Sequence, residues 1–164
     1  EFSKSAEVKT SADSAPVYNL AGKLFYAADT DYVLLTVPNA FVHGIFAAMV
    51  EPGIELPSAS DGKPLMAHIT VFRPEELKKI GGADKIKERG QQFRYSLGRL
   101  KEVKPEGWAN VSKCYFVTVH SPELQALRRS YGLTALPNEG KYEFHITVAV
   151  VRRGVLSANS TAKV

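Results

Sequence analysis

Short runs of apolar residues, several of them alternating with polar ones, follow one another along the chain, which is the pattern of partly buried strands. Two runs are rich in β-branched and aromatic residues, Tyr-Val-Leu-Leu-Thr-Val at 32–37 and Cys-Tyr-Phe-Val-Thr-Val at 114–119. Residues 23–27 form another candidate strand, which can pair with 32–37 across a turn at residues 28–31. The pattern therefore predicts antiparallel strands.

Each of these two runs is followed by apolar residues at helical spacing. The predicted helix faces are Phe41, Ile45, Phe46 and Met49 after the first run and Leu124, Leu127 and Tyr131 after the second. The second helix has clear ends, because Ser121 suits the N-cap, Pro122 suits the first helical position and Gly132 follows the last apolar residue. Between the two halves, residues 75–92 predict a charged helix with a glycine interruption, and residues 93–97 predict a strand.

The most informative feature of the chain is a repeated tetrapeptide. His-Ile-Thr-Val occurs at residues 68–71 and again at residues 145–148, although the chain has only 4 histidines. At ordinary residue frequencies, such a repeat arises by chance on the order of once in a thousand sequences. Each copy follows the same succession of strand, helix and loop, so we infer a tandem duplication.

The spacing inside each copy places the histidine and the threonine on one face of a strand. Successive side chains of a strand point to opposite faces, so His68 lies beside Thr70 and His145 lies beside Thr147. The isoleucine and valine of each copy then bury the other face. Each copy pairs an acid–base group with a hydroxyl on a rigid support, which suits general acid–base chemistry.

Together the elements predict an α+β fold with six or seven strands and three helices. Two strand-helix-strand units, centred on residues 32–72 and 114–150, are expected to form pseudo-symmetric lobes of antiparallel strands with helices packed outside. A central cleft between the lobes would bring both His-Thr pairs to one small ligand.

Composition and length limit the other possibilities. The 164 residues suit one domain, expected at 20–153, between a disordered N-terminal arm at 1–19 and a C-terminal tail at 154–164. No apolar run approaches the length of a membrane span, so no membrane partner is expected. The single cysteine, Cys114, excludes an internal disulfide and is expected to be a buried, inert thiol in a reducing, cytoplasmic location. The net charge of +4 slightly favours a polyanionic partner.

Both tetrapeptides match the His-x-Thr/Ser-x motif of the 2H phosphoesterase superfamily, and the chain resembles that superfamily over about residues 20–153. The resemblance implies two symmetric lobes that line one cleft. It also implies a phosphodiesterase, since members include RNA 2′,3′-cyclic phosphodiesterases, 2′-5′ oligoadenylate phosphodiesterases and phage hydrolases of cyclic oligonucleotides. The expected substrate is therefore a nucleotide, a cyclic oligonucleotide or an RNA end.

The residues suit that chemistry without a metal or any other cofactor. Opening a cyclic phosphodiester needs a base for the attacking water and an acid for the leaving oxygen, and two imidazoles supply both near pH 7. Thr70 and Thr147 can donate hydrogen bonds to the non-bridging oxygens. The chain has no His-x-x-x-His pattern, no triphosphatase loop and no nucleophile elbow. The other histidines, His43 and His120, are expected at the surface.

Five further residues are candidate substrate contacts: Phe72, Arg73, Trp108, Tyr142 and Arg152. Phe72 has the strand parity of the first motif and could stack on a base, with core packing as an equal alternative. The other two aromatic residues lie in loop-like settings and could also stack. The two arginines follow the motifs and could meet phosphates, although a solvated charge is the simpler interpretation.

Two other functions fit the same sequence. A non-catalytic RNA-binding or nucleotide-binding module would keep the cleft without hydrolysing a ligand. A structural domain, for example of a phage particle, would bury both motif histidines and bind nothing. The sequence does not indicate an oligomeric state.

Overall fold

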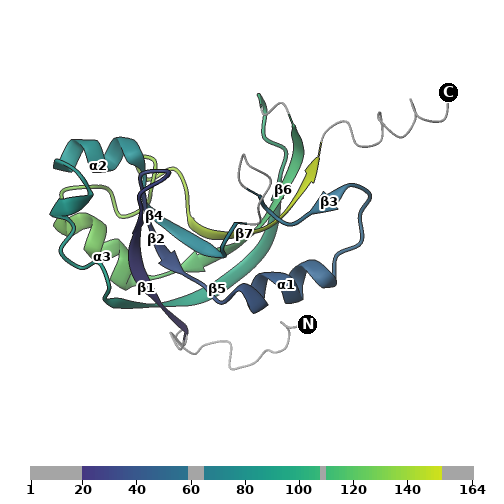
Figure 1. The fold of residues 1–164 in the computed structure, drawn as a ribbon, viewed down its shortest axis with the longest axis horizontal. Coiled ribbons are helices and arrows are strands. Elements are labelled where there is room, and N and C mark those ends of the chain that lie inside the picture. Colours follow the sequence, from purple (N-terminus) through teal and green to yellow (C-terminus); the bar gives the residue numbers. More distant parts are fainter. Residues whose placement is uncertain (1–19, 59–64, 108–109, 153–164) are drawn as a thin grey trace.

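The computed structural model describes residues 20–58, 65–107 and 110–152, which form one seven-stranded sheet with three α-helices (Figure 1). All strand pairings are antiparallel, and the strand order is β3-β7-β6-β5-β1-β2-β4. The predicted α+β class and the predicted numbers of strands and helices are therefore confirmed for the described residues.

The strands are β1 (Leu20–Ala27), β2 (Tyr32–Thr36), β3 (Ile54–Glu55), β4 (His68–Phe72), β5 (Gln92–Val103), β6 (Val111–His120) and β7 (Phe144–Arg152). The helices are α1 (Asn39–Ala47), α2 (Pro74–Ile80) and α3 (Pro122–Ser130), with a short 3-10 helix η1 (Ala83–Lys85). Two strands differ from the predictions. The short β3 lies within 52–64, where the prolines, glycines and serines of the sequence predict a loop, and β5 extends well beyond the predicted range of 93–97.

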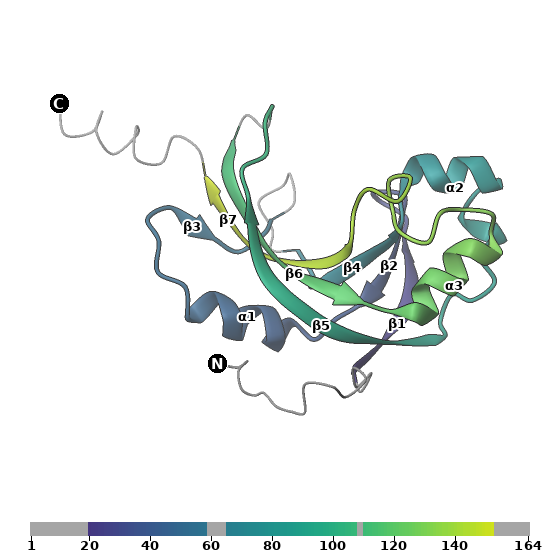
Figure 2. The ribbon, with the colours of Figure 1, turned by 180° about the vertical axis from the view of Figure 1, so that it is seen from behind.

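The sheet curls so that strands far apart in its order come together. β4 at one edge lies beside β7, which is next to the other edge. Figures 1 and 2 show the long, curved β5 and β6 along the bend, with β4 and β7 near its middle. The two strands that carry the repeated tetrapeptide are therefore neighbours in space.

The core lies behind the motif strands, on the face opposite their histidines. Ile69, Val71, Ile146 and Val148 are fully buried, which confirms the predicted alternation. α1 packs against β7, and α3 packs against β4 and β5. Each helix therefore covers a strand of the other half of the chain as defined by the repeat.

The N-terminus of α3 follows the sequence prediction. The Ser121 hydroxyl caps the helix by accepting a hydrogen bond from the Leu124 N–H at 3.1 Å, and Pro122 occupies the first helical position. Gly132 follows the helix with a φ of 78°, a left-handed conformation that glycine adopts without strain.

The charged segment after the first motif is shorter as a helix than predicted. The pattern predicts helix over 75–92, whereas α2 ends at Ile80. Gly81 adopts a left-handed φ of 98°, and the Gly82 N–H donates to the Leu77 carbonyl at 2.8 Å. This arrangement closes the helix and turns the chain away from its axis.

Candidate active site

The two motif histidines occupy matching positions in the sheet. His68 of β4 lies opposite Thr36 of β2, and His145 of β7 lies opposite Thr118 of β6. Each opposing threonine hydroxyl accepts a hydrogen bond from a backbone N–H of a third strand, at 2.9 Å from β1 and at 2.8 Å from β5. The same three-strand arrangement thus supports both histidines.

A glycine allows the third strand to approach in each case. A Cβ atom on Gly22 of β1 would lie 2.0 Å from the Thr36 carbonyl oxygen. A Cβ atom on Gly98 of β5 would lie 2.1 Å from Thr118 Oγ1. Side chains do not fit at such distances, so both positions require glycine. A tandem duplication predicts this correspondence between the halves.

Both imidazoles are also held by the backbone in the same way. His68 Nδ1 lies 2.7 Å from the Met66 carbonyl oxygen, and His145 Nδ1 lies 3.0 Å from the Glu143 carbonyl oxygen. A carbonyl oxygen only accepts hydrogen bonds, so Nδ1 is the protonated nitrogen in each neutral ring. Nε2 is then the nitrogen that exchanges a proton with a ligand.

The surroundings of His68 favour its neutral form. Burial lowers the pKa of His68, the hydrogen bond to the Met66 carbonyl opposes this shift, and the charge of His145 lowers the pKa further. Both histidine residues are partly exposed, so the alternative of a structural domain with two buried histidines does not describe them.

A pocket of about 270 Å³ lies beside the motif strands. Its walls include His68 and Thr147, one residue from each motif. Cys114 lines the same pocket, and its thiol interacts with the Thr147 side chain. Cys114 is buried, and burial raises the pKa of its thiol, although the Thr147 contact opposes the shift. The prediction of a buried thiol is confirmed, and the raised pKa fits an inert one.

β4 and β7 run in opposite directions where they meet. His68 at the start of β4 shares the pocket with Thr147 in the middle of β7. Beyond the end of β4, the Arg73 guanidinium lies 6.0 Å from the ring centroid of Tyr142, which precedes β7. Thr70 and His145 fall between these two contacts.

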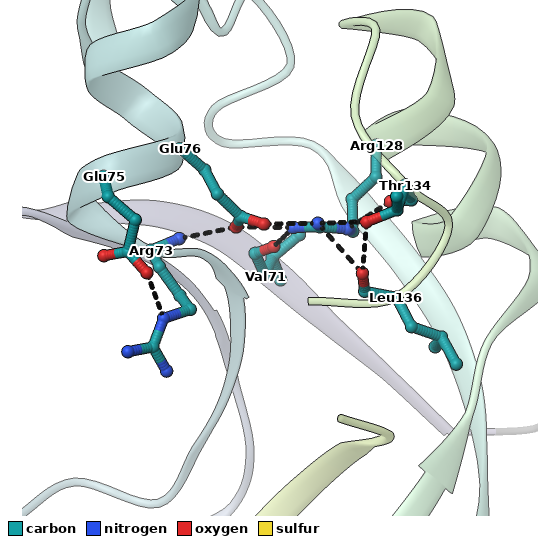
Figure 3. A network of polar contacts seen from close by, with 7 residues as sticks. All are labelled: Val71, Arg73, Glu75, Glu76, Arg128, Thr134 and Leu136. Carbon is teal, nitrogen blue, oxygen red and sulfur yellow. Dashed lines mark hydrogen bonds and ion pairs between the residues drawn. The ribbon is translucent and has the colours of Figure 1, made fainter. Parts of the chain in front are cut away.

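Three of the candidate substrate contacts lie close to the motif strands. Arg73 and Tyr142 meet at one end of β4, where Arg73 also forms an ion pair with Glu75 at 2.6 Å (Figure 3). Arg152 lines the pocket near the other end of β4. The fourth candidate, Trp108, lies outside the described residues.

Phe72, the fifth candidate, belongs to the core. Its side chain is fully buried and packs edge-on against Tyr131, with ring centroids 5.9 Å apart. Strand parity misplaces it because the register of β2 and β4 shifts between Val33 and Leu34, so that one extra residue of β4 interrupts the alternation. The core alternative therefore describes Phe72, and the stacking interpretation does not.

Two side chains near the motifs are missed by the sequence prediction. Phe116 lies opposite Thr147, and its ring centroid is 5.1 Å from that of His145. A sequence signal for Phe116 exists, because it lies two residues before Thr118 in the run at 114–119. The two side chains are therefore expected on the same face of the strand. His43 is exposed, as predicted for a surface residue, yet it lines the pocket. Nothing in the sequence pattern connects it to the first motif.

The chemical groups at this site are imidazoles and hydroxyls. Within the described ranges, no three His, Cys, Asp or Glu side chains come together in a way that could hold a metal ion. The arrangement can move protons at neutral pH and donate hydrogen bonds to an anion. As for membranes, no helix in the described part of the chain is long and apolar enough to span one.

Comparison with known proteins identifies one family. No curated protein and no solved structure matches the chain. The family model of the Swiss Army Knife 2H phosphoesterase domain, 2H-SAK, matches residues 35–156. This match covers more than half of the chain and includes both tetrapeptides. The chain therefore belongs to the 2H phosphoesterases, a family of enzymes that hydrolyse phosphodiester bonds.

Proposed function

We propose that the protein is a metal-independent phosphodiesterase that hydrolyses a cyclic phosphate or a short oligonucleotide linkage by two-histidine acid–base catalysis. The observation that carries this proposal is the matched setting of His68 and His145. Each Nδ1–H is bound to the carbonyl oxygen two residues earlier, which leaves each Nε2 for proton transfer. Two such imidazoles on neighbouring strands supply the base and the acid of one displacement.

The lowered pKa of His68 supports its assignment as the base. In this scheme, His68 Nε2 takes a proton from water as the water oxygen attacks phosphorus. The bond between phosphorus and the leaving oxygen breaks, and His145 Nε2 gives a proton to that oxygen. Thr70 and Thr147 donate hydrogen bonds to the non-bridging oxygens, whose negative charge grows in the transition state. The product is a phosphate monoester.

We further propose that residues 20–153 form one bilobed domain, with pseudo-symmetric halves centred on 32–72 and 114–150. The corresponding hydroxyl contacts of Thr36 and Thr118 support this assignment. The active site would then be the cleft where β4 meets β7.

The proposed substrate is a nucleotide, a cyclic oligonucleotide or an RNA end. Tyr142 is half-exposed and can stack on a base, and Arg73 beside it can meet a phosphate. Arg152, which lines the pocket, is the candidate contact to the reacting phosphate. Contact by Trp108 and a cytoplasmic location both stay predictions.

A substrate panel tests the proposed function. The protein is incubated with 2′,3′-cyclic nucleotides, 2′-5′ oligoadenylates and 3′-5′ cyclic dinucleotides, and the products are identified by mass spectrometry. We expect at least one class to be converted to phosphate monoesters, and the variant His68→Ala to be inactive in a parallel incubation. Binding of these compounds without turnover by the unaltered protein would favour a non-catalytic module.

A further inference from the structure

The pocket beside His68 and Thr147 has walls that the reaction scheme does not use. Its volume of about 270 Å³ is just below the range of roughly 300–1,000 Å³ that is common for small-molecule sites. We propose that it is a nucleobase subsite, which holds the base of the nucleotide whose phosphate is attacked. This inference rests on the proposed function and adds a position and a chemical class for the substrate group.

Most of the pocket wall is apolar. The apolar lining residues are Val42, Leu56, Pro57, Leu65, Met66, Ala67, Val111 and Val150. Two of them, Leu65 and Met66, are large side chains that stay 45% and 54% exposed. A hydrogen bond of 3.0 Å from the Leu65 N–H to the Pro57 carbonyl holds this part of the wall in place. The flat face of a base would cover exposed apolar surface at this wall.

The charge of the pocket argues against a second phosphate as its occupant. Among the described residues that line the pocket, Arg152 is the one with a permanent charge, and it forms an ion pair with Glu55 at 3.1 Å. The Arg152 guanidinium also donates to the Ser58 hydroxyl at 2.7 Å. Beyond this paired cation, which is the candidate contact to the reacting phosphate, the described lining carries no permanent charge, so the rest of the pocket favours an uncharged group. A nucleobase is such a group, with polar edges for recognition.

Two polar residues of α1 can read those edges. Asn39 and His43 are one helical turn apart, so they share a face of α1, and both line the pocket. The Ala67 N–H donates to Asn39 Oδ1 at 2.8 Å, which fixes the orientation of the amide. The Asn39 amide NH₂ is therefore the donor that this residue can offer to a carbonyl oxygen or ring nitrogen of a base. The His43 imidazole can donate or accept.

The test combines binding and kinetics. Binding of adenosine, guanosine, cytidine and uridine is measured by NMR titration. In parallel, kcat/KM is compared for the nucleoside 2′,3′-cyclic phosphates and for glycerol 1,2-cyclic phosphate, which has the same reacting ring without a base. The variants are Leu65→Ala, which removes an apolar wall, and Asn39→Asp, which keeps the oxygen that accepts from Ala67 but removes the NH₂ donor. Leu100→Ala is the matched control, because Leu100 is also half-exposed but does not line the pocket.

We expect the unaltered protein to bind at least one nucleoside and to prefer its cyclic phosphate over the base-free compound. Leu65→Ala should reduce that preference by about 5- to 30-fold, a typical effect of lost apolar contact in a pocket. Asn39→Asp should weaken the binding of the preferred nucleoside, and Leu100→Ala should change neither quantity. If no nucleoside binds, or if Leu65→Ala and Leu100→Ala behave alike, the subsite is refuted. Nucleoside binding that depends on Leu65, without hydrolysis of any compound in the substrate panel, would support the subsite and refute the proposed function.

Discussion

Arg128 and Glu76 form a buried ion pair that joins α3 to α2 (Figure 3). The two guanidinium NH₂ nitrogens of Arg128 donate to the two carboxylate oxygens of Glu76 at 2.8 and 2.6 Å. The Arg128 side chain is fully buried, and that of Glu76 is nearly so. Both charges are therefore taken out of water and compensated by each other.

The remaining donors of Arg128 connect β4 to the segment that follows α3. The guanidinium donates to the carbonyl oxygen of Val71, which follows Thr70 in β4, at 2.6 Å. It also donates to the carbonyl oxygens of Thr134 and Leu136, in the segment that leads to β7, at 2.8 and 3.1 Å. One buried side chain thus ties the first motif strand to α2 and to the segment after α3.

Replacing Arg128 by methionine should strongly destabilise the fold. The substitution leaves the Glu76 carboxylate buried without its ion-pair partner, with the Arg73 N–H as its remaining donor, and such a loss typically costs about 3–5 kcal/mol. The free energy of unfolding is measured by urea denaturation followed by circular dichroism. The double variant Arg128→Met with Glu76→Leu should recover part of the loss, because neither charge remains while the three carbonyl oxygens still lack the Arg128 donors. A single variant within about 1 kcal/mol of the unaltered protein would show that the pair is not compensated as described.

The same pair should make stability sensitive to acid. Burial would raise the pKa of Glu76, but hydrogen bonds from Arg128 and from the Arg73 backbone outweigh burial, so the net shift is downward. A lowered pKa in the folded state adds stability above the carboxylate's ordinary pKa, and this stability is lost as the pH falls through the lower folded value. The difference in unfolding free energy between the unaltered protein and Glu76→Gln should therefore shrink from pH 7 to pH 3. A constant difference over that range would contradict the shift.

Activity should survive removal of divalent cations. The proposed acid and base are both imidazoles, so no step needs a bound metal. Turnover of the best substrate is measured after exhaustive dialysis against EDTA, and again after Mg²⁺, Mn²⁺ or Zn²⁺ is added back. Unchanged rates are expected. Loss of turnover that one of these ions restores would rule out the mechanism.

The motif threonines should contribute less than the histidines. Thr70→Val and Thr147→Val each remove one hydrogen-bond donor to the transition state, which typically lowers kcat by about ten- to a thousand-fold. Thr70→Ser and Thr147→Ser keep the hydroxyl and serve as matched controls, with most of the activity retained. Serine variants as inactive as the valine variants would show that shape, and not the hydroxyl, matters at these positions.

Local sequence patterns predict the motif strands well, but they do not predict contacts between segments that are distant in the sequence. The alternation around His68 and Thr70 holds because one side of β4 is core. It fails at Phe72, where a β-bulge that no local pattern announces turns the side chain into the core. In the sequence, Arg128 is simply one charged residue of a predicted helix, and its partner Glu76 lies 52 residues away. Only the folded chain brings them together.

The pocket shows the same limit. Asn39 and His43 lie on α1, which ends at Ala47, well before the first motif begins at His68. Their place beside His68 therefore depends on the packing of α1 against β7. The duplication could be read from the two tetrapeptides. The glycines that support it, Gly22 and Gly98, gain their meaning only when the third strand of each half is in place.

The central claim is that His68 and His145 act together in one displacement. The most direct measurement is kcat/KM of His68→Ala, of His145→Ala and of the double variant on the best substrate of the panel. Each single variant should lose on the order of 10²- to 10⁴-fold or more, and the double variant should lose far less than the product of the two losses, because the two groups serve the same transition state. Either single variant with near-normal turnover, or losses that multiply in the double variant, would contradict the two-histidine mechanism.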